Sequence, residues 1–141
     1  MTAATPEVAV GAVAVHDDAI LLIRRGRGPS RGDWSVPGGR VEPGETVYEA
    51  VVREAYEETA LEVVVDRFLG WVERIGPADD STPDYHFVIL DFAVTVLDPL
   101  QTPVAGDDAV DVMWVPFTEL SDKRLAPGLH DALHDMGVVP N

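Results

Sequence analysis

The sequence predicts an α/β fold in one domain, and three observations lead to that prediction. Several stretches of branched and aromatic apolar residues have the length and composition of β-strands. One longer stretch of alanine, glutamate, valine and arginine, free of glycine and proline, has the composition of an α-helix. The chain has 141 residues, the size of one domain, so we expect residues 1–141 to form a single domain of strands and helices.

The first strands are expected close to the N-terminus. Residues 8–15 are small or branched and apolar, and the turn-forming His16-Asp17-Asp18 separates them from the apolar run 20–25. This pattern predicts a β-hairpin. Residues 26–32 are rich in glycine and arginine and predict a loop. The next apolar residues meet Pro37-Gly38-Gly39, where the freedom of the backbone predicts a turn.

The helix is expected over residues 45–59, after the break that Pro43-Gly44 provides. No internal repeat or linker divides the chain. The remaining expectations are a long or bent strand over 62–75, a loop over 76–83, strands over 85–97 and 110–115, a loop over 98–108, a short helical turn near 118–120 and an amphipathic helix near 127–136.

The composition excludes several classes of function. The chain contains no cysteine, which removes disulfides, thiolate zinc sites, iron–sulfur clusters and a cysteine nucleophile. Its formal net charge of −15 argues against a broad basic surface for nucleic acid. No apolar stretch approaches the roughly 18 residues that span a bilayer, and the first residues lack the pattern of a signal peptide. We therefore expect a cytoplasmic protein without nucleic-acid or membrane partners.

Three glutamates share one face of the predicted helix. At about 100° per residue, Glu54, Glu57 and Glu58 fall within an arc of about 100°, on the face that is apolar in the earlier turns. Like charges three and four residues apart repel, and the negative end of the helix dipole adds to the cost. A divalent cation such as Mg²⁺ would offset both costs, because it takes hard oxygen ligands. The pattern indicates a metal site, with a solvated acidic face as the alternative.

Half of the basic residues lie in one short segment. Five of the ten lysine and arginine residues fall within it: Arg24, Arg25, Arg27, Arg31 and Arg40. In an acidic protein such a segment predicts a local positive site for a small anion, unless the arginines are simply solvated. Trp34 lies beside them and is a candidate for stacking on a nucleobase, with core packing as the alternative. The same two alternatives hold for Tyr85 and Phe87.

The residues of the acidic helix and the segment before it resemble the Nudix box. In that family's pattern a glycine is followed by five residues, a glutamate, seven residues and then Arg-Glu-U-x-Glu-Glu-x-Gly-U, where U is a bulky aliphatic residue. The segment Gly39–Leu61 matches at Gly39, Glu45, Arg53, Glu54, Glu57, Glu58 and Leu61. It departs at Ala60, where the family has glycine, and at the small Ala55. Neither departure removes a ligand, so the sequence is identified as a member of the Nudix family.

This resemblance implies a fold, a cofactor and a set of site residues. The implied fold is the family's α/β/α sandwich, with a mixed β-sheet between helices. The implied cofactor is Mg²⁺, with Mn²⁺ as the alternative. Its expected ligands are the carboxylates of Glu54, Glu57 and Glu58 and the backbone carbonyl of Gly38 or Gly39. Arg53 would pair with Glu45 and hold the loop before the helix against it.

The resemblance also implies a reaction. Nudix enzymes hydrolyse a phosphoanhydride bond in a nucleoside diphosphate linked to another group, and the cation neutralises the phosphates and activates water. A carboxylate accepts the proton of that water, and the candidates are a glutamate of the box, Asp107 or Asp108. Arg25 and Arg40 are the expected contacts to the phosphates, because they lie closest to the end of a strand and to the glycine pair.

Other features favour one branch of the family. Pro77, sixteen residues beyond Leu61, and the segments 85–92 and 106–109 resemble small bacterial ADP-ribose pyrophosphatases. ADP-ribose, split into AMP and ribose 5-phosphate, is therefore the expected substrate. The alternatives are a hydrolase that removes nucleoside triphosphates and a non-catalytic Nudix module that senses a nucleotide. A homodimer is also compatible with the sequence.

Overall fold

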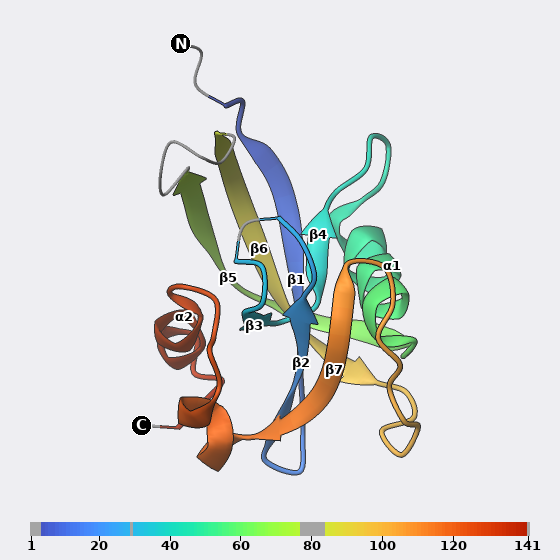
Figure 1. Cartoon of the computed structure of the whole chain (residues 1–141). Helices are drawn as coiled ribbons and strands as arrows, with labels where there is room; N and C mark the ends of the chain where they lie inside the picture. Colours follow the sequence, from blue (N-terminus) through green and yellow to red (C-terminus); the bar gives the residue numbers. More distant parts are fainter. Residues whose placement is uncertain (1–3, 29, 77–83, 141) are drawn as a thin grey trace.

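The computed structural model describes residues 4–28, 30–76 and 84–140, and its strands lie between two helices (Figure 1). The elements in chain order are β1 (Glu7–His16), β2 (Ala19–Arg25), β3 (Trp34–Ser35), β4 (Gly38–Arg40), α1 (Val47–Thr59), β5 (Val63–Gly76), β6 (Tyr85–Val96), β7 (Ala109–Pro116), a 3₁₀ helix (Phe117–Asp122) and α2 (Leu129–Asp135). No helix in the described part of the chain is long and apolar enough to cross a membrane.

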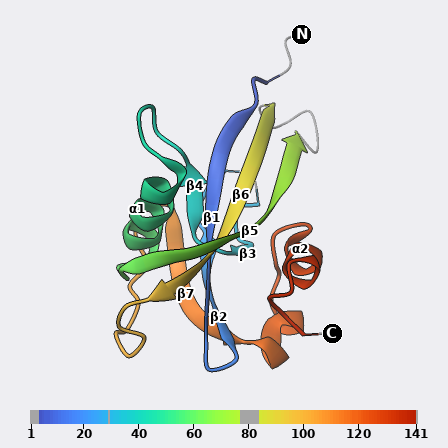
Figure 2. The same cartoon turned by 180° about the vertical axis from the view of Figure 1, so that it is seen from behind.

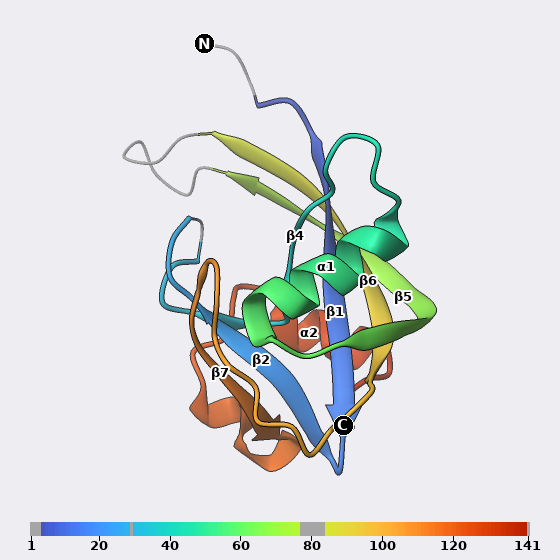
Figure 3. The same cartoon turned by 90° about the vertical axis from the view of Figure 1, so that its right-hand side faces the viewer.

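The strands form a mixed sheet. Hydrogen-bonded neighbours follow the order β3-β2-β1-β6-β5, with β4 paired to β1 and β7 paired to β2. β1 is parallel to β6 and antiparallel to β2 and β4. Helix α1 covers one side of the strands and α2 lies on the opposite side, as Figures 2 and 3 show. The predicted α/β fold with a mixed sheet between helices is therefore confirmed.

Two groups of buried apolar side chains join the layers. The group between α1 and the sheet includes Val10, Ala50, Val51, Ala55 and Phe92. The group on the α2 side includes Ile20, Leu22, Trp34, Val115 and Leu133. Burying one large apolar side chain contributes roughly 1.5–3 kcal/mol, so both helices are fixed against the strands. The acidic last turn of α1 is held in place by this packing.

The predicted hairpin of β1 and β2 is present. His16 pairs with Ala19, and the two residues between them, Asp17 and Asp18, have φ angles of 50° and 58°. Two successive positive φ angles are those of a type I′ turn, which matches the twist of the two strands. Aspartate tolerates this left-handed conformation better than most residues, which explains why the turn lies here.

The predicted turn at Pro37-Gly38-Gly39 is wrong in its last two residues. Gly38 and Gly39 belong to β4, which pairs with β1 so that Gly38 lies opposite Gly11. A Cβ atom added to Gly38 would lie 2.1 Å from the carbonyl oxygen of Val10. Glycine is needed here because two backbones approach closely, and the sequence alone does not distinguish this need from that of a turn.

Helix α1 begins two residues later than the sequence predicts. Thr46 is its N-cap: the Thr46 hydroxyl accepts a hydrogen bond from the Glu49 amide, and the Glu49 carboxylate accepts one from the Thr46 amide. This reciprocal pair is a capping box, so Glu45 lies outside the helix. The helix ends at Thr59, and its C-cap Ala60 has a φ of 63° and donates its N–H to the Tyr56 carbonyl. Ala60 thus adopts the left-handed conformation that the family's glycine would favour.

The other predicted elements are present with small shifts of their ends. β5 is long and bent, with irregularities between Val65 and Arg67 and between Phe68 and Gly70. β6, β7, the helical turn and the last helix lie where the sequence predicts them. The predicted loop at 76–83 and its Pro77 lie outside the described residues, apart from Gly76.

Candidate active site

Three carboxylates meet at the C-terminal end of α1. Glu54 and Glu57 come from the helix and Asp107 from the loop between β6 and β7, and one oxygen from each lies within 4.8 Å of the others. We call these three side chains the acidic cluster. The loop reaches the helix because the amide of Val104 donates to the Thr59 carbonyl at 2.9 Å. Asp107 itself has a φ of 52°, so the loop turns sharply at this residue.

Glu54 is the buried member of the acidic cluster. Its carboxyl lies against Gly39, where an added Cβ atom would come within 2.6 Å of it. Burial raises the pKa of Glu54, hydrogen bonding by Arg53 opposes this rise, and repulsion by Glu57 and Asp107 adds to it. Glu54 is therefore a carboxylate that a nearby cation would stabilise in its charged form.

Glu58 is fully buried and lies outside the acidic cluster. Its Oε1 accepts a hydrogen bond of 2.8 Å from the amide of Gly38, which ties α1 to β4. Burial raises the pKa of Glu58 to about 8, and the hydrogen bond from Gly38 only partly offsets this rise. The structure thus brings Asp107, rather than Glu58, to the other two predicted ligands.

Arg53 organises the glutamates at this end of the fold. Its Nε and Nη2 donate to the two oxygens of Glu45 at 2.7 and 3.0 Å, so the expected pair is present as a bidentate ion pair. Its Nη1 donates to Glu54 at 2.8 Å and to Glu57 at 3.1 Å. The hydrogen bond from Arg53 lowers the pKa of Glu45. Because Nη2 also donates to the carbonyl of Arg40, the guanidinium joins the loop, the helix and β4.

A cleft of about 1200 Å³ opens beside the acidic cluster. Gly38, Gly39 and Glu54 lie at one part of its wall. Its basic side chains are Arg25, Arg27, Arg40 and Arg74. On β6 the rings of Tyr85 and Phe87 stack with their centroids 5.8 Å apart, and both residues line the cleft. The cleft therefore combines carboxylates, cations and aromatic faces, which are the groups that bind a metal, phosphates and a base.

The predicted substrate contacts divide into two groups. Arg25 and Arg40 line the cleft, and Arg40 also forms an ion pair of 3.1 Å with Glu7. Trp34 is buried in the core on the α2 side, with the amine of Lys123 at 5.1 Å from its ring centroid, and is not among the residues that line the cleft. The prediction that Trp34 stacks on a nucleobase is therefore corrected to core packing.

Asp108 has a different setting from Asp107. Its carboxylate forms an ion pair with Arg27, and its carbonyl accepts a hydrogen bond of 2.7 Å from the amide of Gly26. Asp108 lines the cleft but does not belong to the acidic cluster. Of the two loop aspartates, only Asp107 lies within the group that can hold a metal ion.

Arg74 and Asp91 are among the cleft residues that the sequence does not single out. Arg74 of β5 donates a hydrogen bond of 2.6 Å to the hydroxyl of Ser30, and Asp91 of β6 is buried in the cleft wall. Asp91 could have been found from its register: Tyr85, Phe87, Ile89 and Asp91 alternate along β6, so a strand directs them to one face. Arg74 carries no comparable signal, because charged residues are common on edge strands.

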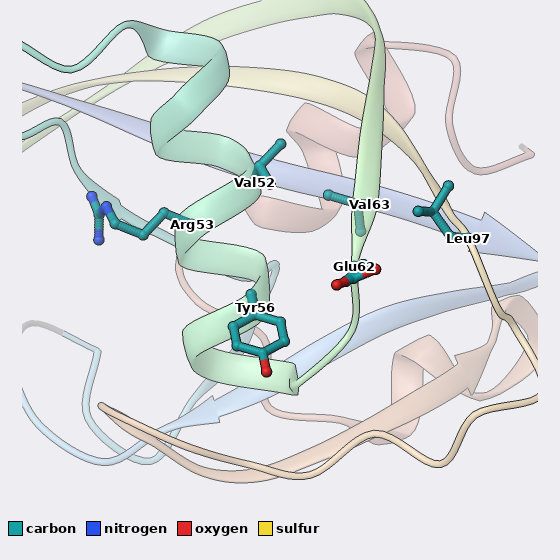
Figure 4. Close-up of a pocket in the computed structure, with 6 residues that line it drawn as sticks. All are labelled: Val52, Arg53, Tyr56, Glu62, Val63 and Leu97. Atoms are coloured by element: carbon teal, nitrogen blue, oxygen red, sulfur yellow. The ribbon is translucent and has the colours of Figure 1, made fainter.

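A second, smaller hollow of about 410 Å³ lies on the other side of α1 (Figure 4). Its wall includes the apolar side chains of Val52, Val63 and Leu97. Figure 4 shows Arg53 extending from α1 away from Val63 and Leu97. No member of the acidic cluster lines this hollow, whereas Glu54 lines the larger cleft.

Comparisons with known proteins identify the family of this chain. A model of the NUDIX domain family matches residues 5–136. The ADP-ribose pyrophosphatase of Methanocaldococcus jannaschii is 39% identical over 115 residues, which are 82% of this chain and 64% of that protein. The human 8-oxo-dGDP phosphatase NUDT18 is 36% identical over 120 residues, which are 84% of this chain and 34% of that protein. This chain thus spans less than two thirds of the length of either relative.

A solved structure gives the same result for the fold. The crystal structure of a MutT NUDIX hydrolase from Burkholderia pseudomallei matches with a TM-score of 0.76 and 29% identity, over 92% of this chain and 97% of that one. The family match covers almost all of the described residues and includes the whole acidic helix and the loop of Asp107. On these findings, the chain belongs to the NUDIX domain family.

Proposed function

We propose that this protein is a Mg²⁺-dependent pyrophosphohydrolase that acts on a nucleoside diphosphate linked to another group. The best single substrate is ADP-ribose, split into AMP and ribose 5-phosphate. The observation that carries the proposal is the acidic cluster of Glu54, Glu57 and Asp107, of which Glu54 lines a cleft that also presents arginines. The identity of 39% to an ADP-ribose pyrophosphatase supports the choice of substrate.

The residues of the acidic cluster fit a hard divalent cation. Three carboxylate oxygens within 4.8 Å of one another repel, and one of them belongs to the buried Glu54. Mg²⁺ prefers such oxygen ligands, and Mn²⁺ accepts the same set. Glu54, Glu57 and Asp107 would hold the ion. The family resemblance also implies Glu58 and the carbonyl of Gly38 or Gly39 as ligands. When bound, the ion supplies charge neutralisation at the pyrophosphate and a water of lowered pKa.

The chain's own side chains supply binding and proton transfer. Arg25 and Arg40 of the cleft bind the anionic oxygens of the pyrophosphate. Arg53 orients Glu54 and Glu57 through its hydrogen bonds of 2.8 and 3.1 Å. Asp107 accepts a proton from the attacking water while the oxygen of that water bonds to phosphorus. The bridging P–O bond breaks, and its electron pair leaves with the other phosphate. Asp108 is the weaker candidate for this base, because Arg27 already engages it.

A second candidate substrate class has its own support. The human relative at 36% identity is named for its action on 8-oxo-dGDP, a nucleoside diphosphate with no further group attached. The same acidic cluster and arginines serve that reaction, because the bond broken is again a phosphoanhydride. If the cleft binds a nucleotide and no bond is broken, the protein is a module that senses a nucleotide without hydrolysing it.

One substrate panel tests the proposal. Wild-type protein is incubated with ADP-ribose, NADH, dinucleoside polyphosphates, nucleotide sugars, 8-oxo-dGDP and nucleoside triphosphates, with Mg²⁺, Mn²⁺ or EDTA, and the products are separated by chromatography. We expect AMP and ribose 5-phosphate from ADP-ribose with Mg²⁺, and no turnover with EDTA. Turnover confined to nucleoside di- and triphosphates would favour the second candidate. No turnover of any compound with either metal would overturn the proposal.

A further inference from the structure

Asp91 is a largely buried carboxylate in the wall of the cleft. It lies on β6, is 6% exposed and lines the cleft. No hydrogen bond or ion pair joins its side chain to another of the described residues. Its oxygens are not among the fully buried unsatisfied atoms of the described residues, so the carboxyl is open to a hydrogen-bond donor in the cleft although most of the residue is removed from solvent. Burial also raises the pKa of Asp91 to about 6.

The strand register places Asp91 close to the acidic cluster. Gly11 of β1 pairs with Asp91 on one side and with Gly38 on the other. Asp91 therefore lies two strands from Gly38, a separation of roughly 10 Å. A Cβ atom added to Gly11 would lie 2.1 Å from Oδ1 of Asp91, so the carboxyl occupies the space that a side chain at Gly11 would fill. The fold thus makes room for this carboxyl at a fixed position in the wall.

The surroundings of Asp91 suit the uncharged part of a nucleotide. Phe87 and Ile89 lie on the same face of β6, and Leu129 lines the cleft from α2. The arginine of β5, Arg74, is engaged by the Ser30 hydroxyl. A carboxylate repels phosphate oxygens but accepts hydrogen bonds from O–H and N–H groups. A carboxylate acceptor flanked on its strand by aromatic and apolar side chains is therefore suited to a sugar or a base rather than to a phosphate.

We propose that Asp91 determines substrate specificity by accepting a hydrogen bond from an O–H or N–H donor on the substrate's nucleoside. The inference rests on the proposed function, because it takes the cleft to bind a nucleotide derivative. The metal and the arginines hold the pyrophosphate, and Asp91 selects the group attached to it. A site that hydrogen-bonds a donor rejects analogues that lack it, since its own buried group is then left unpaired.

Binding of nucleoside monophosphates tests this role without hydrolysis. AMP, GMP, 2′-deoxy-AMP and ribose 5-phosphate contain no phosphoanhydride bond, and their affinities are measured by titration calorimetry with Mg²⁺ present. We expect Asp91→Asn to weaken the best ligand of the wild-type protein by about 5- to 10-fold, because the uncharged amide oxygen of asparagine accepts a weaker hydrogen bond than a carboxylate does. A loss that persists with ribose 5-phosphate identifies a sugar hydroxyl as the donor, and a loss confined to the nucleotides identifies the base.

Two further variants make the result decisive. Gly11→Ala displaces the Asp91 carboxyl without changing its chemistry, so it is expected to weaken the same ligands. Asp66→Asn is the matched control, because Asp66 is exposed on β5, bonds to Thr95 and does not line the cleft. The inference is overturned if Asp91→Asn binds every ligand with an affinity within about twofold of that of wild type. It is also overturned if the wild-type protein binds none of these ligands. Failure of the proposed function appears separately, as binding without hydrolysis in the substrate panel.

Discussion

Replacing Asp91 with asparagine changes how the stability of the fold depends on pH. Burial holds the pKa of Asp91 at about 6, above the ordinary value of 3.8 for the unfolded chain. The folded protein therefore keeps this proton to higher pH than the unfolded chain does. The resulting stability is fully present below about pH 4 and is lost as the pH rises through about 6. A shift of this size corresponds to about 3 kcal/mol, because one pKa unit corresponds to about 1.4 kcal/mol.

The assay is urea unfolding of wild type and Asp91→Asn between pH 4 and pH 8. Asparagine is nearly isosteric with aspartate and does not ionise, so its own burial cost is the same at every pH. We expect the variant's free energy of unfolding, relative to wild type, to rise by about 2.4 kcal/mol from pH 4 to pH 7, since a small part of the effect lies below pH 4. The control Asp66→Asn, at an exposed position, is expected to differ from wild type by less than about 1 kcal/mol throughout.

A constant difference between Asp91→Asn and wild type across this range would refute the reasoning. It would mean that the carboxyl ionises as easily in the folded protein as in the unfolded chain, so that solvent or an ion in the cleft already compensates its burial. A difference that falls with pH would contradict the sign of the shift and imply that a positive group engages Asp91.

The remaining predictions concern the acidic cluster and the arginines. Gly39→Ala is expected to lower kcat by at least about 10-fold, since the new Cβ would lie 2.6 Å from the Glu54 carboxyl. An unchanged kcat in steady-state assays would show that Glu54 moves without loss of activity. Arg25→Ala is expected to lower kcat/KM by about 10- to 150-fold, and Arg31→Ala, outside the cleft, by less than about threefold; equal effects would remove the phosphate role. The melting temperature is expected to rise and saturate with MgCl₂, and an equal rise with NaCl of matched ionic strength would indicate a solvated acidic face.

Much of the fold could be predicted because its signals are local. The hairpin of β1 and β2, the long strands and helix α1 follow from runs of apolar residues and from turn residues at their ends. The strand at Gly38-Gly39 could not be predicted in this way, because Gly38 allows a close approach between two strands and Gly39 leaves room for the Glu54 carboxyl, and neither forms a turn. That requirement depends on which strands become neighbours, which is a property of the whole topology.

The candidate site likewise has residues that the sequence brings together and residues that only the tertiary fold brings together. Glu54, Glu57 and Arg53 lie on one helix, so their spacing alone brings them together. Asp107 joins them only because its loop packs on the end of α1, and Asp91 reaches the cleft only through the pairing of β1 with β6. Trp34 looked like a stacking residue beside the arginines, but the sheet turns its side chain into the core.

The most direct test of the account is the activity of Glu57→Gln beside that of Glu119→Gln. Glu57 belongs to the acidic cluster, whereas Glu119 is exposed on the 3₁₀ helix and lies outside it, so the two variants make the same chemical change in different places. With Mg²⁺ and the best substrate of the panel, we expect Glu57→Gln to lose at least about 100-fold in kcat/KM and Glu119→Gln to stay within about twofold of wild type. A value for Glu57→Gln within about threefold of wild type would contradict the assignment of the acidic cluster as the metal centre.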